Sequence, residues 1–192
     1  MYQKIIILLL VVFYTTSCTQ WRIKKQLESF CKETIYIPSE FDILQDGVLF
    51  DSLQQPLTDK IKFILYFSAD RCTSCTIGKL RDYEKIVKLQ IEGLFSPIII
   101  FSPKEDAWEY KALITDLKIQ SLPYPIYIDK HNKFQQENPK LPEDTRYHTF
   151  LLDKNNHVVL VGNPLASDAM WSLFKSTLDN MLAHDGVYVP EK

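Results

Sequence analysis

Two cysteines separated by two residues are the strongest chemical signal in the sequence. Cys72 and Cys75 enclose Thr73 and Ser74 and directly follow Arg71. Cysteines at this spacing can close a tight disulfide, and the thiolate form of the first would be the nucleophile. A neighbouring cation and hydroxyl donors stabilise a thiolate and lower its pKa. We therefore expect Cys72 to attack and Cys75 to resolve, with Arg71, Thr73 and Ser74 lowering the pKa of Cys72.

The other cysteines do not complete a metal or haem motif. Structural zinc would need a second pair of ligands, but Cys18 and Cys31 lie far apart in the sequence. Attachment of c-type haem needs histidine after the second cysteine, where this chain has Thr76. Cys31 shares helical spacing with Leu27, which favours a small buried apolar residue over a third redox thiol.

The elements around the motif are predicted to place Cys72 at the start of a helix. Residues 61–67 are apolar on both faces, as in a central strand covered on both sides, and a short polar turn follows. From Cys75 towards Leu89 the apolar residues have helical spacing. Free N–H groups and the dipole at a helix N-terminus stabilise a thiolate there.

The rest of the chain alternates between strand and helix patterns, which indicates an α/β sandwich around a mixed sheet. We predict that Trp108, Ala112 and Leu113 face the core. Three of the histidines, His131, His157 and His184, lie in turn or tail positions and are predicted to be solvated. The predicted strands are 34–37, 47–50, 98–101, 125–128, 149–152 and 158–161, and the predicted helices are 19–32, 104–117 and 168–182.

The segment YFSADRCTSC resembles the active site of the TlpA/ResA branch of thioredoxin-like proteins, with Arg71 in place of the family's tryptophan. YHTFLLDKNNHVVLVGNP resembles the strand pair beside that site, and the resemblance spans about residues 35–183. It implies a thioredoxin-like sandwich, a mixed central sheet flanked by helices, with an N-terminal β-hairpin and a central insertion. It also implies a thiol–disulfide oxidoreductase whose partners are protein thiols and disulfides, with no cofactor beyond the Cys72–Cys75 disulfide.

The chain departs from the family pattern at the loop facing the motif. The family has a cis-proline there, and the match of FLLD puts Tyr147 at that position, with His148 next. A cis bond before a residue other than proline costs about 2.5–4 kcal/mol, so we predict a trans bond. His148 is either within reach of Cys72 and Cys75 or a solvated loop residue. Glu105 is the nearest match to the family's buried acid and would be a proton shuttle, unless it only supports the first turn of a helix.

Composition and the N-terminus indicate where the protein works. The 192 residues are 46% hydrophobic and 24% charged, which fits one globular domain. The net charge of -2 leaves no basic surface for nucleic acid. Residues 1–17 read as a lipoprotein-type signal peptide with Cys18 as the lipidated residue, 18–33 as a membrane tether or short helix, 34–184 as the thioredoxin-like domain and 185–192 as a tail. We expect a monomer on the periplasmic face of the cell envelope, where disulfide chemistry is permitted.

Three other functions remain open. A copper-binding or copper-delivery module could use Cys72, Cys75 and His148, because thiolates and imidazole select copper(I). A thiol peroxidase would need a proline and a threonine ahead of the cysteine, and both are missing. The third is a redox-inactive protein that has kept the thioredoxin-like fold and lost thiol–disulfide turnover. The redox partner and the direction of exchange are not determined by the sequence.

Overall fold

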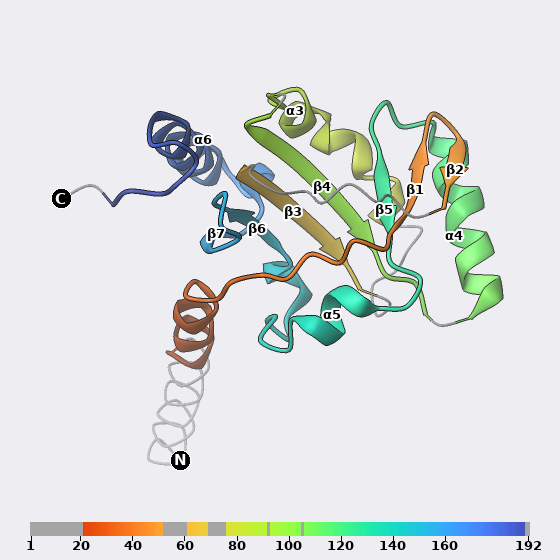
Figure 1. Cartoon of the computed structure of the whole chain (residues 1–192), viewed down its shortest axis with the longest axis horizontal. Coiled ribbons are helices and arrows are strands. Elements are labelled where there is room, and N and C mark those ends of the chain that lie inside the picture. Colours follow the sequence, from red (N-terminus) through yellow and green to blue (C-terminus); the bar gives the residue numbers. More distant parts are fainter. Residues whose placement is uncertain (1–20, 52–60, 69–75, 92, 105, 191–192) are drawn as a thin grey trace, which may run out of the picture.

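A seven-stranded mixed sheet forms the centre of the computed structural model, which describes residues 21–51, 61–68, 76–91, 93–104 and 106–190 (Figure 1). The strand order is β2-β1-β5-β4-β3-β6-β7. β3, β4 and β5 run parallel, while β1, β2, β6 and β7 pair antiparallel with their neighbours. The strands are β1 (Asp42–Gln45), β2 (Val48–Phe50), β3 (Ile61–Phe67), β4 (Phe95–Phe101), β5 (Ile126–Ile128), β6 (Thr149–Leu152) and β7 (Val158–Val161).

β3 is the central strand that the apolar run predicts. It lies between β4 and β6, and all seven of its residues are buried. β4 begins at Phe95, earlier than the predicted start at Ile98. Pro97 is tolerated inside β4 because β5 pairs only with Ile100 and Phe101, which leaves the flank beside the proline without a strand among the described residues.

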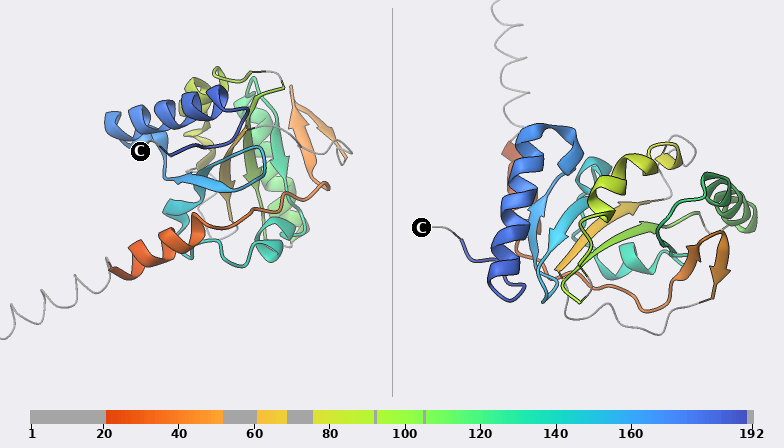
Figure 2. Two further views of the ribbon diagram at one scale, coloured as in Figure 1. Left: turned by 60° about the vertical axis from the view of Figure 1, so that its left-hand side comes forward. Right: turned by 90° about the horizontal axis from the view of Figure 1, so that it is seen from above.

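Helices cover both faces of the sheet (Figure 2). One core lies under α3, α4 and α6, and the other lies under α5 and the helix at 21–30. No described helix has the length and apolar character needed to cross a bilayer. The helical elements are 21–30, η1 (Leu80–Tyr83), α3 (Glu84–Val87), α4 (Ala107–Gln120), α5 (Lys133–Glu137), η2 (Thr145–Tyr147), η3 (Pro164–Ala166) and α6 (Asp168–Ala183).

The helix predicted to run from Cys75 to Leu89 is broken in its described part. Residues 76 and 77 are helical, a turn follows, and the chain continues as the 3₁₀ helix η1 and then α3. The hydroxyl of Tyr124 donates to the carbonyl oxygen of Leu80 at 2.6 Å. This carbonyl therefore has a tertiary partner, and the backbone N–H of Glu84 donates instead to the carbonyl of Arg81.

The N-terminal hairpin has its second strand where predicted, but its first strand is 42–45 in place of the predicted 34–37. β1 pairs with β2 across a turn at Asp46 and Gly47, whereas residues 34–37 form no strand and only Thr34 makes a bridge, to His157. The side chain of Asn138 accepts from the backbone N–H of Tyr36 at 2.9 Å and donates to the carbonyl oxygen of the same residue at 2.8 Å. A side chain thus provides the hydrogen bonds that a neighbouring strand would otherwise make.

The prediction that Trp108 and Ala112 face the core is wrong. Asp106 caps α4 by accepting from the backbone N–H groups of Trp108 and Glu109, and the helix then buries Leu113, Ile114 and Leu117. Because these three residues face the core, Ala112 points outward and Trp108 is 79% exposed. Both lie on the opposite side of α4 from its buried residues.

Candidate functional site

The carboxyl ends of β3, β4 and β5 meet at one edge of the sheet. The backbone N–H of Ser102, just after β4, donates to the carbonyl oxygen of Phe67 at 2.9 Å. The backbone N–H of Asp129, just after β5, donates to the carbonyl oxygen of Phe101 at 2.8 Å. The chain leaves β3 at this edge, and only residues 68–71 separate the end of β3 from the Cys-x-x-Cys motif in the sequence. Ligand sites in α/β proteins usually lie outside this edge of the strands.

The motif itself lies outside the described residues, together with Glu105 and Cys18. The roles predicted for Arg71, Cys72, Thr73, Ser74 and Cys75 therefore stay predictions. The residues on either side of the motif are described. Ser68 and Thr76 line one small cavity with Ser102, and Ile77 is buried in the core. Both ends of the segment thus lie at the carboxyl edge of the sheet.

The loop predicted to face the motif lies beside the end of β3. Its turn, η2, is capped by Asp144, which accepts from the backbone N–H of Arg146. The carbonyl oxygen of His148 then accepts from the backbone N–H of Tyr66 at 2.9 Å, one residue before β3 ends. The peptide bond before Tyr147 is trans as predicted, since the described residues contain no cis bond.

His148 is buried, which rules out the solvated loop histidine. Only 4% of the residue is exposed, and its ring packs on the ring of Tyr66 with centroids 5.2 Å apart. The Nε2 atom lies 2.7 Å from the carbonyl oxygen of Pro142 and must donate to it, because a carbonyl only accepts. That nitrogen is therefore engaged within the fold. His131, His157 and His184 are exposed, as predicted.

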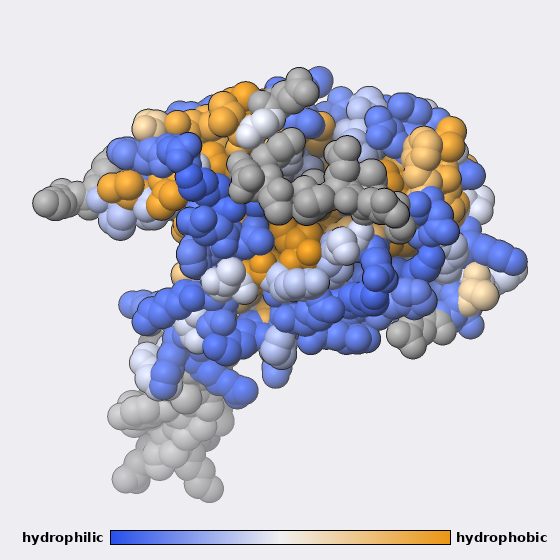
Figure 3. Space-filling model, viewed as in Figure 1, coloured by the Kyte–Doolittle hydropathy of each residue, from blue (hydrophilic) through white to orange (hydrophobic). Residues whose placement is uncertain are grey.

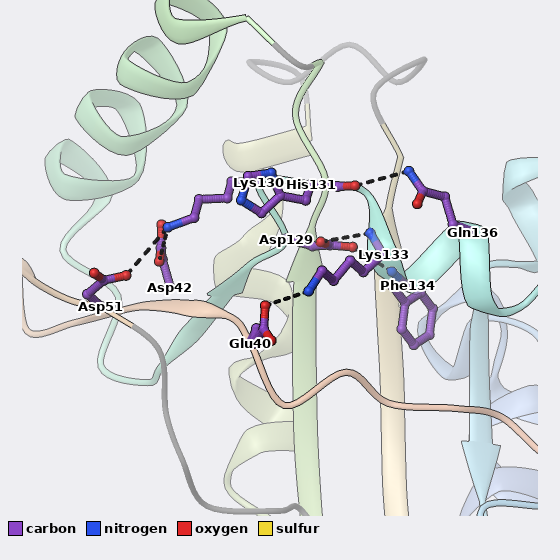
Figure 4. Close-up of polar contacts among 9 residues, drawn as sticks. All are labelled: Glu40, Asp42, Asp51, Asp129, Lys130, His131, Lys133, Phe134 and Gln136. Atoms are coloured by element: carbon purple, nitrogen blue, oxygen red, sulfur yellow. Dashed lines mark hydrogen bonds and ion pairs between the residues drawn. The ribbon is translucent and has the colours of Figure 1, made fainter.

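Asp129 lies at the same edge of the sheet, where its carboxylate accepts hydrogen bonds from neighbouring segments. The sequence does not predict this role. The residue is 1% exposed, and its carboxylate accepts from the backbone N–H groups of Lys133 at 3.0 Å and Phe134 at 2.7 Å (Figure 4). The hydroxyl of Ser102 donates to it at 3.2 Å. An aspartate followed by Lys-His-Asn at the end of an apolar strand is the available signal, because this pattern favours a side-chain-capped turn.

A second carboxylate, Asp42, joins β1 to α4 and to the turn after β5. It accepts from the hydroxyl of Tyr110 at 2.6 Å and from Nζ of Lys130 at 3.1 Å. Lys130 also reaches Asp51 at 3.4 Å (Figure 4). Burial opposes ionisation of Asp42, but the hydrogen bonds from Tyr110 and Lys130 outweigh it and hold the pKa of Asp42 below its ordinary value. Burial and the hydrogen bond to Asp42 raise the pKa of Tyr110.

In Asp42→Asn, the free energy of unfolding is expected to depend less on pH at acidic pH than it does in the wild type. Because the folded-state pKa of Asp42 is lowered, its contribution is present above the unfolded pKa near 4 and is lost as the pH falls through the folded value. The difference in free energy of unfolding between the wild type and the variant should be about 1–2 kcal/mol at pH 7 and should shrink towards pH 2. Urea unfolding across this range measures it. Asp179→Asn, at an exposed carboxylate, is the control, and a difference that stays constant with pH would contradict the assignment.

An apolar groove of about 790 Å³ lies between the helix at 21–30 and the loop before β6. Ile23, Leu27 and Cys31 contribute one face of the helical segment, and Tyr147 lies on the other side. The prediction that Cys31 is buried is wrong, because its side chain is exposed on the wall of this groove. The buried position at this end of the helix belongs instead to Phe30, which packs edge-on against Phe150.

We expect Cys31 to be alkylated slowly at neutral pH. Although the side chain is accessible, its apolar neighbours desolvate the thiol and raise its pKa, so little thiolate is present. Iodoacetamide labelling followed by mass spectrometry should show a rate that rises nearly tenfold between pH 7 and pH 8. The denatured protein is the control and should react faster at pH 7. Equal rates in the folded and denatured protein would show that the groove does not alter the thiol.

The described residues contain no group of three or more histidine, cysteine or acidic side chains that could hold a metal ion. The predicted set of Cys72, Cys75 and His148 extends beyond them, because both of its cysteines lie outside the described part of the chain.

Solved structures of similar shape identify the fold. A thiol-disulfide isomerase from Corynebacterium glutamicum is 15% identical with a TM-score of 0.51, over 75% of this chain and 94% of that one. AhpC from Enterococcus faecalis is 15% identical with a TM-score of 0.50, over 82% of this chain and 96% of that one. No family model and no curated protein matches the sequence. The likenesses confirm the predicted thioredoxin-like fold, and at such identities they show the fold alone.

Proposed function

We propose that this protein is a membrane-anchored thiol–disulfide oxidoreductase of the cell envelope. One observation carries the proposal: in the sequence only residues 68–71 separate the Cys-x-x-Cys motif from β3, the central strand of a thioredoxin-like sheet, and β3 ends at the edge where the parallel strands β4 and β5 also end. Similarity to a thiol-disulfide isomerase supports the same function through the fold. The Tyr147–His148 loop beside β3 would border the space where a substrate disulfide approaches.

In the proposed reaction Cys72 and Cys75 pass through a mixed disulfide. The Cys72 thiolate attacks one sulfur of the substrate disulfide, the substrate S–S bond breaks, and its other sulfur leaves as a thiolate that takes up a proton. Cys75 then loses its proton and attacks the sulfur of Cys72, which releases the second substrate thiol and leaves the Cys72–Cys75 disulfide. The substrate gains two electrons, and a dithiol partner must return them to the protein. The reverse sequence oxidises a dithiol substrate.

A redox titration of the purified protein tests this proposal. The protein is equilibrated in glutathione or dithiothreitol buffers, and the Cys72–Cys75 disulfide is followed by alkylation and mass. A single reversible midpoint supports exchange, and its value assigns the direction as reductant or oxidant. Thiols that never form the disulfide, or that resist alkylation until a chelator is added, would reject turnover. The second result would favour a metal site made by Cys72, Cys75 and His148.

Lipidation of Cys18 is the second part of the proposal. The apolar run before Cys18 and the small Ser17 support cleavage and lipid attachment at this cysteine. Mass spectrometry of the membrane fraction should find a lipid-modified Cys18 at the N-terminus of the wild-type protein, and Cys18→Ser should lack both the lipid and the cleavage. An unmodified Cys18 in the membrane-bound wild-type protein would show that lipid is not the anchor.

A further inference from the structure

β2 is the strand at one outer edge of the described sheet. β1, β5 and β4 lie between it and β3. All three residues of β2 are large, apolar and exposed: Val48 by 53%, Leu49 by 37% and Phe50 by 52%. Figure 3 shows apolar side chains gathered over β1 and β2. Proteins usually protect an edge strand with lysine, proline or a bulge, because its free backbone groups can pair with another chain. Between Val48 and Phe50 there is no such feature.

The hairpin geometry identifies which backbone groups of β2 face outward. Asp46 and Gly47 have φ values of 50° and 75°, which makes a two-residue turn of the primed kind and makes the flanking Gln45 and Val48 a hydrogen-bonded pair. Hydrogen-bonded and non-hydrogen-bonded pairs alternate along an antiparallel ladder. Leu49, opposite Leu44, is therefore in a non-hydrogen-bonded pair. Its N–H and carbonyl point away from β1, towards the side of β2 on which no other described strand pairs.

The charges around β2 indicate what kind of strand would fit. Asp46 and Asp51 lie at the two ends of the strand, and the side chain of Asp51 is 88% exposed even though it pairs with Lys130. A second copy pairing antiparallel about Leu49 would bring Asp46 of one chain close to Asp51 of the other, and like charges disfavour this arrangement. A strand with lysine or arginine at its ends would instead meet opposite charges.

We propose that β2 is a docking edge that receives an extended segment of a partner protein as an added strand. The segment pairs with the outward backbone groups of Leu49, covers the three apolar side chains and has basic residues at its ends. Main-chain hydrogen bonds supply the affinity in this mode of recognition, and side chains on alternating faces supply the selectivity. This surface acts independently of thiol–disulfide exchange.

Binding of a synthetic peptide to the purified protein tests the docking edge. The peptide alternates valine and threonine and has lysine at both ends; a matched peptide has glutamate at the ends. We expect saturable binding of the lysine peptide by fluorescence anisotropy, binding at least about tenfold weaker for the glutamate peptide, and loss of affinity as salt is added. Absence of saturable binding would overturn the proposal.

Leu49→Pro separates strand addition from simple apolar contact. Proline removes the outward N–H, and an edge strand tolerates this because the ladder to β1 does not use that group. The variant should keep the thermal midpoint of the wild type and lose peptide binding about tenfold, whereas Leu49→Thr, which keeps the N–H, should retain it. Asp46→Asn with Asp51→Asn provides a second test that spares the backbone and should remove the preference for lysine ends. Equal binding by Leu49→Pro would overturn strand addition, as would a wild-type dimer that Leu49→Pro dissociates, since the occupant would then be a second copy.

Discussion

Cys72→Ser is expected to reduce thiol–disulfide exchange by more than about a thousandfold, because a serine hydroxyl is not a thiolate and cannot form the mixed disulfide. Reduction of a model protein disulfide, such as insulin, with dithiothreitol as the electron donor measures this loss. The variant should keep the thermal midpoint of the reduced wild type, since the substitution changes little volume and both proteins then lack the Cys72–Cys75 disulfide. Retention of even a tenth of the wild-type rate would exclude Cys72 as the nucleophile.

Cys75→Ser should separate the two halves of the reaction. Cys72 can still attack the substrate, but no thiol is available to release it, so a mixed disulfide should accumulate and be visible by mass under non-reducing conditions. Cys31→Ser is the matched control, because it removes a thiol that lies in the apolar groove, and it should leave the rate unchanged. A mixed disulfide trapped through Cys31 would instead assign attack to the groove cysteine.

Continuous apolar runs made the central strands predictable. A strand covered on both faces must be largely apolar on both, so the apolar runs at residues 63–67 and 150–152 locate β3 and β6 from the amino-acid pattern. The predicted trans bond before Tyr147 followed in the same way from the missing proline. These features depend on the local sequence, which is why they could be predicted.

The features that were not predictable depend on partners far away in the chain. His148 is buried against the ring of Tyr66 and the carbonyl of Pro142. Where the helix after the motif is interrupted, the carbonyl of Leu80 accepts from the hydroxyl of Tyr124. Cys31 has the helical spacing of a core residue, but the core at that end of the helix is filled by Phe30 against Phe150. Periodicity describes a face of an element and does not say which part of that face is covered.

Asp129→Ala is expected to lower the free energy of unfolding by about 3 kcal/mol, which corresponds to a drop of about 10 °C in the thermal midpoint. The substitution leaves the backbone N–H groups of Lys133 and Phe134 without their acceptor and removes the partner of the Ser102 hydroxyl. Since Asp129 is 1% exposed, water cannot easily replace the carboxylate. The cost should therefore be close to that of leaving buried donors unsatisfied.

The effect of Asp129→Ala should also reach the candidate site. The bonds to Asp129 hold the start of α5, where the ring of Phe134 packs 4.9 Å from that of Tyr66, and Tyr66 in turn packs on His148. Amide hydrogen exchange should accordingly increase more in α5 and in the loop before β6, which also open locally, than in α6 on the other core, where only the loss of global stability acts. Asp129→Asn keeps one acceptor and should cost less, while Asp179→Ala at an exposed carboxylate should change stability by less than about 0.5 kcal/mol. An increase in α5 and in the loop before β6 no larger than that in α6 would show that Asp129 acts on global stability alone and does not position this edge.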